Sequence, residues 1–130
     1  MHMRFFGDSY DIVKKSLINW LSHFGDWPVH RMLTEAASEN EIIAFVRFLG
    51  AHVISSEILT QSTNRQSYLS CALECGNLFL DPDTGLKMQN TIGSRAPEYL
   101  FAHEFASLMQ SRPNALTLVF DQSLPRGSER

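Results

Sequence analysis

Short apolar segments without polar alternation recur between amphipathic segments that have the period of a helix. This order of segments along the chain constrains the fold more than any other feature. The clearest example is segment 77–80, which runs directly into the strand-breaking sequence Asp-Pro-Asp-Thr-Gly at 81–85. A strand that leaves no polar face for water is typical of a parallel sheet covered by helices on both sides. We therefore predict an α/β fold, a three-layer, Rossmann-like sandwich with a mostly parallel sheet.

Apolar residues at helical spacing predict four helices. The first covers 9–24, and the face that we expect to be buried carries six large side chains: Tyr10, Val13, Leu17, Trp20, Leu21 and Phe24. The second begins at Ser38, which forms a capping box with Glu41. The third covers 65–74, and the fourth begins at 98 or 103 and ends at 110.

The remaining apolar segments predict the strands of the sheet. Their expected positions are 27–33, 52–55, 77–80 and 115–120. Segment 86–97 is expected to be an irregular loop, and 124–130 a frayed polar tail. No repeat or shift in composition marks a boundary, so residues 1–130 are interpreted as a single domain.

The composition excludes several classes of function. The formal net charge is −3 and no basic run occurs, so there is no strong signal for nucleic-acid binding. No apolar stretch approaches the length of about 18 residues that spans a membrane, and the N-terminus lacks a signal-peptide pattern. We therefore expect no membrane association and a cytoplasmic location.

Acidic side chains follow two of the predicted strands, at the edge where parallel sheets bind ligands. Asp81 and Asp83 follow one strand and Asp121 follows another. Carboxylates grouped at one edge are typical ligands of Mg²⁺, which in turn binds phosphate groups. This pattern predicts a catalytic or metal site at Asp81, Asp83 and Asp121, with Asp8 and Asp11 as neighbours. The alternative is ordinary turn chemistry, in which each Asp bonds its own backbone.

Other reactive side chains favour structural roles. Cys71 and Cys75 lie four residues apart without a second cysteine motif, which indicates buried thiols rather than a metal or redox pair. His103 and Glu104 are adjacent in a helix and would point in different directions. No glycine-rich phosphate loop follows any strand, which argues against dinucleotide or kinase chemistry.

Three motifs resemble those of a family of uncharacterised bacterial proteins. They are Gly-Asp-Ser-Tyr-Asp-Ile-Val-Lys at 7–14, Asp-Pro-Asp-Thr-Gly at 81–85 and Phe-Asp-Gln-Ser at 120–123. The layout is also distantly similar to ribosomal RNA adenine-N6 methyltransferases, which carry Asp-Pro-Pro-Tyr after the corresponding strand. This chain has Asp83 and Thr84 at the last two positions. The base-stacking aromatic is therefore missing, and we do not expect S-adenosylmethionine as a cofactor.

Two hypotheses from different classes follow. In the first, the chain binds a nucleotide or phosphate ligand through Mg²⁺ at the acidic edge. The second draws on the resemblance, which implies that relatives continue beyond Arg-Gly-Ser-Glu at 126–129. A shortened version would leave an edge or apolar face to recruit a partner. It would be a non-catalytic interaction or inhibitor domain that binds another protein or a second copy of itself. The sequence leaves open whether the chain is an enzyme.

Overall fold

The computed structural model describes residues 6–123, so the tail predicted at 124–130 lies outside the described residues. The described part contains helices α1 (Ser9–Leu21), α2 (Glu39–Leu49), α3 (Arg65–Leu69) and α4 (Ala102–Ser111), and strands β1 (Val29–His30), β2 (Leu78–Leu80), β3 (Gly85–Lys87), β4 (Tyr99–Phe101) and β5 (Thr117–Val119). Short 3-10 helices follow α1 (η2, Ser22–Phe24) and α3 (η3, Ser70–Glu74) and precede β4 (η4, Ala96–Glu98). None of these helices is long and apolar enough to cross a membrane.

The strands form two small parallel sheets. The first has the order β1-β2-β5, and the second pairs β3 with β4. β2 is central in the larger sheet, with His30 opposite Leu80 on one side and Leu118 opposite Phe79 on the other. The predicted mixed α/β class with parallel strands is therefore confirmed at this level.

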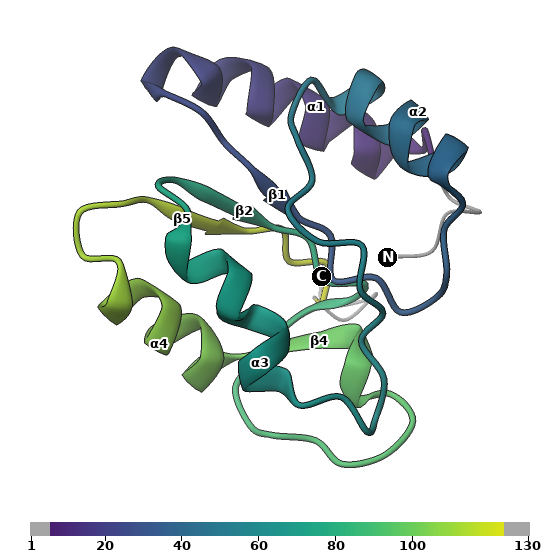
Figure 1. Ribbon diagram of the computed structural model, residues 1–130, viewed down its shortest axis with the longest axis vertical. Helices are drawn as coiled ribbons and strands as arrows, with labels where there is room; N and C mark the ends of the chain where they lie inside the picture. The colour runs from purple at the N-terminus through teal and green to yellow at the C-terminus, as the bar shows by residue number, and fades with distance from the viewer. Residues whose placement is uncertain (1–5, 124–130) are drawn as a thin grey trace, which may run out of the picture.

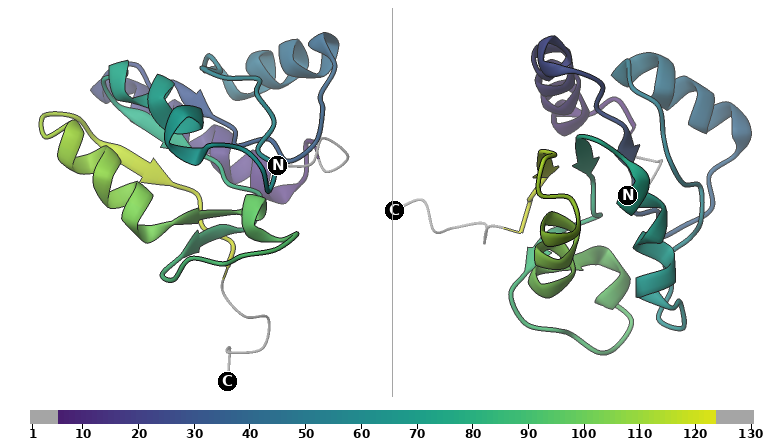
Figure 2. Two further views of the ribbon diagram at one scale, coloured as in Figure 1. Left: turned by 60° about the horizontal axis from the view of Figure 1, so that its bottom comes forward. Right: turned by 60° about the vertical axis from the view of Figure 1, so that its left-hand side comes forward.

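Alternate side chains of β2 point into two different hydrophobic clusters. Phe79 packs with buried residues of α1 and α2, and Leu78 and Leu80 pack with buried residues of α3 and α4. Figures 1 and 2 show these helix pairs on opposite sides of the sheet. The two clusters are possible because successive residues of a strand face opposite ways.

The second predicted helix is confirmed as α2. The Ser38 hydroxyl accepts from the Glu41 amide, and the Glu41 carboxylate accepts from the Ser38 amide at 2.7 Å. Gly50 ends the helix in a left-handed conformation with φ of 74°, which glycine adopts without steric cost.

The predicted buried face of α1 is wrong. The helix buries Asp11, Lys14, Ile18 and Leu21. Five of the six side chains expected inside are exposed on α1 and on η2 after it: Tyr10, Val13, Leu17, Trp20 and Phe24. The two sets lie on adjacent stripes of one helix. The stripe that carries Lys14 faces the sheet because Asp81, at the end of β2, binds its ammonium group.

The predicted strands were too long in places, and one pair was missed. Segment 27–33 forms only the two-residue β1, and segment 52–55 contributes a single bridge from Val53 to Val29. Segment 86–97, expected to be irregular, overlaps β3 and η4, and β4 follows it. Because β3 and β4 are three residues each, neither produces an alternation pattern long enough to recognise.

Candidate functional site

Four charged side chains are buried together at the carboxyl ends of β1 and β2, and we call them the charged cluster: Asp11, Lys14, Arg31 and Asp81. Arg31 directly follows β1 and Asp81 directly follows β2. The Asp81 amide donates to the His30 carbonyl at 2.9 Å, which holds these strand ends side by side. The first helix supplies the other two side chains from its N-terminal half.

Lys14 is the centre of the charged cluster. Its Nζ lies 2.9 Å from Oδ1 and 3.0 Å from Oδ2 of Asp81, and 3.2 Å from Oδ1 of Asp11. The Gly7 amide donates to the other Asp11 oxygen at 2.8 Å. The Arg31 guanidinium stacks on the ring of Phe45, 4.2 Å from its centroid. Two cations and two carboxylates therefore balance in a region closed to water, where an uncompensated charge would be costly.

Burial shifts the titration of these groups. It raises the pKa of Asp81, against the opposing effect of the Lys14 ammonium. Burial alone lowers the pKa of Lys14, but the carboxylates of Asp81 and Asp11 outweigh it and the net pKa is raised. Burial lowers the pKa of Arg31, although Asp81 and Asp11 favour its charged form. The contacts with Asp81 and Asp11 therefore favour the protonated, charged form of Lys14.

The three predicted metal-ligating carboxylates have different neighbours. Asp81 contacts Lys14, whereas Oδ2 of Asp83 lies 3.4 Å from the Thr34 hydroxyl. The Asp121 carboxylate accepts from the amides of Leu86 and Ser123 at 3.2 and 2.9 Å. Within residues 6–123, no group of three or more His, Cys, Asp or Glu side chains could hold a metal ion.

Asp121 fits closely over Gly85 at the start of β3. Although burial opposes ionisation, hydrogen bonds from Ser123 and Leu86 lower the pKa of Asp121. A Cβ atom at Gly85 would overlap Oδ1 of Asp121, and Gly85 has φ of 143°. The second and third sequence motifs therefore meet in space, with Asp121 bonding the backbone of β3. Asp8, the other predicted neighbour of the site, is the N-cap of α1.

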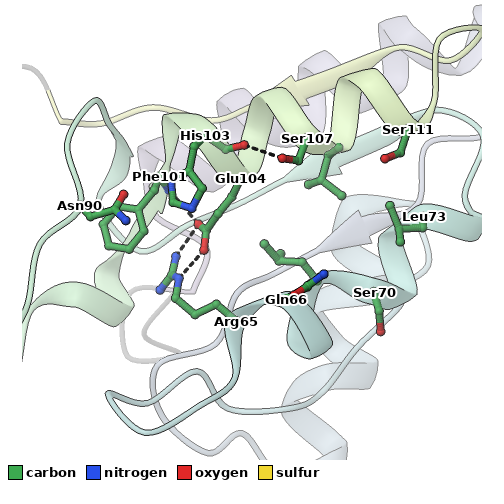
Figure 3. Close-up of a pocket in the computed structure, with 12 residues that line it drawn as sticks. Arg65, Gln66, Ser70, Leu73, Asn90, Phe101, His103, Glu104, Ser107 and Ser111 are labelled. Carbon is green, nitrogen blue, oxygen red and sulfur yellow. Dashed lines mark hydrogen bonds and ion pairs between the residues drawn. The ribbon is translucent and has the colours of Figure 1, made fainter.

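A groove of about 410 Å³ lies between α3, η3 and α4 (Figure 3). Its lining residues are Arg65, Gln66, Leu69, Ser70, Leu73, Asn90, Phe101, His103, Glu104, Ser107, Leu108 and Ser111. Arg65 and Glu104 neutralise one another there, with Nε 2.5 Å from Oε1 and Nη2 2.7 Å from Oε2. Glu104 also accepts from the Phe101 amide, and the His103 ring stacks on the Phe101 ring. His103 and Glu104 thus both contact Phe101, His103 through the ring and Glu104 through the backbone amide.

The two cysteines are free thiols, half-buried and bonded to backbone. Sγ of Cys71 donates to the Tyr68 carbonyl, and Sγ of Cys75 donates to the Cys71 carbonyl, both at 3.7 Å. Burial raises the pKa of both thiols. Raised pKa values reduce the thiolate fraction and with it the nucleophilicity of the sulfur.

Large apolar side chains are exposed along α1 and η2 and along the segment that contains β5, and we call them the α1/β5 face: Tyr10, Val13, Leu17, Trp20, Phe24, Leu116 and Leu118. Trp20 and Phe24 are 62% and 61% exposed, although both are aromatic. The helix and strand are joined at both ends of the face. The Tyr10 ring packs edge-on against Phe120, and the Asn77 side chain links the Phe24 carbonyl to the Leu116 amide.

No protein-family model, curated protein or solved structure matches this chain.

Sequence reasoning missed two members of the charged cluster, Lys14 and Arg31. One signal was available, because Asp11, Lys14, Ile18 and Leu21 recur at alternating spacings of three and four residues. Charged residues in such a stripe are candidates for a buried ion pair. Arg31 had no comparable signal, since its burial depends on the packing of Phe45 from α2.

Proposed function

We propose that this chain is a non-catalytic interaction domain and that its binding surface is the α1/β5 face. The observation that carries the proposal is the stripe of five large apolar side chains that α1 and η2 present to solvent. Contiguous apolar surface on a folded domain is characteristic of a site that another protein covers. The spacing of the stripe supports the same reading, because the sequence pattern is that of a buried helix face.

Site-specific photo-crosslinking tests this proposal. A benzophenone side chain is placed at Trp20, at Val13, or at Ile92, which is fully exposed outside the face. We expect abundant crosslinked products from positions 13 and 20 in bacterial cells, and few from position 92. The mass of each product identifies the partner. Equal yields from all three positions, or no product from 13 and 20, would refute the proposal.

A second candidate function is binding of a nucleotide or another phosphate-bearing ligand, together with its Mg²⁺, at the carboxyl edge that carries Asp81, Asp83 and Asp121. The charged cluster favours it, since Arg31 and Asp81 follow neighbouring parallel strands, where α/β sheets bind ligands. Helices on both faces of the parallel sheet support the corresponding three-layer, Rossmann-like plan.

Thermal unfolding tests the second candidate function. A ligand at one hundred times its Kd stabilises the folded state by about 2.7 kcal/mol. We expect Mg²⁺ with a nucleoside triphosphate to raise the Tm saturably and Asp83→Asn to abolish the rise. Asp83 is the suitable position because Asp81→Ala would break the ion pair with Lys14 whether or not a ligand binds. No rise with Mg²⁺, nucleotides or S-adenosylmethionine would eliminate this function.

We also propose a cytoplasmic location. Cys71 and Cys75 are both free thiols, and a reducing compartment preserves this state.

A further inference from the structure

We propose that the partner on the α1/β5 face is a second copy of this chain, joined by antiparallel pairing of the two β5 strands. This inference rests on the proposed function, because it assumes that the face is a binding surface. It adds the identity of the partner and the register of the contact.

The outer edge of β5, with which no strand of residues 6–123 pairs, supplies the first contact. β5 is the last strand in the order β1-β2-β5, and residues 116, 118 and 120 bond to β2. In a parallel pair the alternate residues direct their N–H and C=O groups to the other side. The backbone groups of Thr117 and Val119 therefore point outward along the edge, where an additional strand can bind.

Pairing about a two-fold axis satisfies these groups in both copies. When Thr117 of one copy lies opposite Val119 of the other, each pair exchanges two hydrogen bonds. Leu118 then lies opposite its own equivalent on the axis. The two three-stranded sheets become one continuous six-stranded sheet, and the contact is closed because both copies use the same surface.

The first helix supplies the second contact. Tyr10, Val13, Leu17, Trp20 and Phe24 follow alternating spacings of three and four residues, the pattern of a coiled-coil seam. An axis perpendicular to the sheet keeps both α1 helices on the same face. Strands lie about 4.8 Å apart and packed helices 8–10 Å apart. Because α1 contacts β2 through Lys14 and Asp81 as well as the β5 segment through Tyr10 and Phe120, a helix set half a strand spacing back from β5 would lie about 9.6 Å from its symmetry mate, within the packing range.

The face is also symmetric about its own centre. Tyr10 contacts Phe120, and Phe24 is linked to Leu116 through Asn77. Leu17 is midway between Tyr10 and Phe24, and Leu118 is midway between Leu116 and Phe120. Both midpoints therefore fall near one line across the face. A two-fold axis beside Leu17 and Leu118 superimposes the apolar surface of one copy on that of the other.

The charge distribution favours a second copy as well. Asp11 and Lys14 are buried, and Nζ of Lys15 lies over the Phe48 ring of α2, 4.8 Å from its centroid. The exposed seam of α1 is therefore uncharged, and two such seams meet without repulsion. A stable interface buries about 800 Å² on each partner, and an aromatic side chain alone covers about 150–250 Å². The seven side chains of the face are 37–62% exposed, so about half of each is open to a partner, and together they approach that scale.

Sedimentation equilibrium of the full chain is the first measurement. We expect twice the 14.8 kDa chain mass, and monomers for Leu17→Lys and Leu118→Lys. Ile92→Lys is the matched control, because it adds the same charge at an exposed apolar position outside the face, and it should stay dimeric. Circular dichroism verifies that each variant folds.

Amide hydrogen exchange on the unaltered chain tests the register without relying on any variant. Thr117 and Val119 amides should become protected as concentration rises, while the Leu118 amide, bonded to β2, is protected throughout. A monomer at all concentrations overturns the inference. So does a dimer in which the Thr117 and Val119 amides exchange fast, and so does a dimer that persists in the Leu17→Lys and Leu118→Lys variants. If the chain is monomeric but Trp20 crosslinks to another protein, the interaction function stands and only its partner changes. Absence of any crosslink from the face refutes both.

Discussion

At the scale of single residues, His30 is a fully buried imidazole at the end of β1. Its Nδ1 accepts from the Met32 amide, and its ring packs against Tyr68. Burial lowers the pKa of His30 to about 4, and the Tyr68 carbonyl opposes the shift only weakly. The folded protein therefore keeps this ring neutral at pH values where the unfolded chain protonates it.

His30 should make the protein sensitive to mild acid. Its stabilising contribution is complete above the unfolded pKa of 6.5 and is lost as the pH falls toward about 4. A shift of this size corresponds to roughly 3 kcal/mol in the free energy of unfolding. Urea titrations at pH 7 and pH 4.5 should show a large loss in the natural chain and a smaller one in His30→Asn. His52→Asn, an exposed control, should retain the large loss; equal losses in all three would contradict the assignment.

At the scale of elements, β3 depends on one glycine. Gly85 combines φ of 143° with a position where a Cβ would overlap Oδ1 of Asp121. The same Asp121 oxygen accepts from the Leu86 amide, and so holds the chain after β5 against β3. The close approach of these two segments requires that position 85 has no side chain.

Gly85→Ala should therefore destabilise the protein by about 1–3 kcal/mol. Gly76→Ala is the control, because a Cβ there meets no atom within 4 Å, and its effect should stay within about 0.5 kcal/mol. Urea unfolding measures both. In a double-mutant cycle, part of the Gly85→Ala effect should disappear in the Asp121→Ala background, because the overlapping oxygen is gone. Strict additivity would show that only the backbone conformation matters.

At the scale of the whole molecule, the sequence predicted the alternation of elements better than their contacts. The Ser38 capping box and the apolar segment 77–80 identify α2 and β2, because each depends on neighbours in the chain. The face of α1 was mistaken because two adjacent stripes both look buried, and tertiary contacts of the Lys14 stripe with Asp81 and with the hydrophobic cluster around Phe79 distinguish them. The charged cluster likewise unites residues far apart in sequence.

The sequence predicted that Asp81 lies at the end of a strand, but it did not predict which groups the carboxylates of the candidate site contact. The prediction placed Asp81 after a parallel strand, where the structure has it. It did not anticipate that the Lys14 ammonium lies against the Asp81 carboxylate and donates to its Oδ2, or that Asp121 bonds the backbone of β3. Such partners are fixed by tertiary packing and leave no local pattern. Ligand binding by the three carboxylates stays a prediction for the thermal unfolding experiment.

The central position of β2 also matters while the chain is being made. Its three apolar residues pair on one side with β1, which precedes it, and on the other with β5, which begins 37 positions after Leu80. At a synthesis rate of about 5–20 residues per second, that side of β2 lacks its partner for roughly 2–7 s after Leu80 is added. An unpaired apolar edge in a growing chain invites association with neighbouring nascent chains. A strand of only three residues limits this hazard, since it offers few backbone groups before translation delivers the strand that covers it.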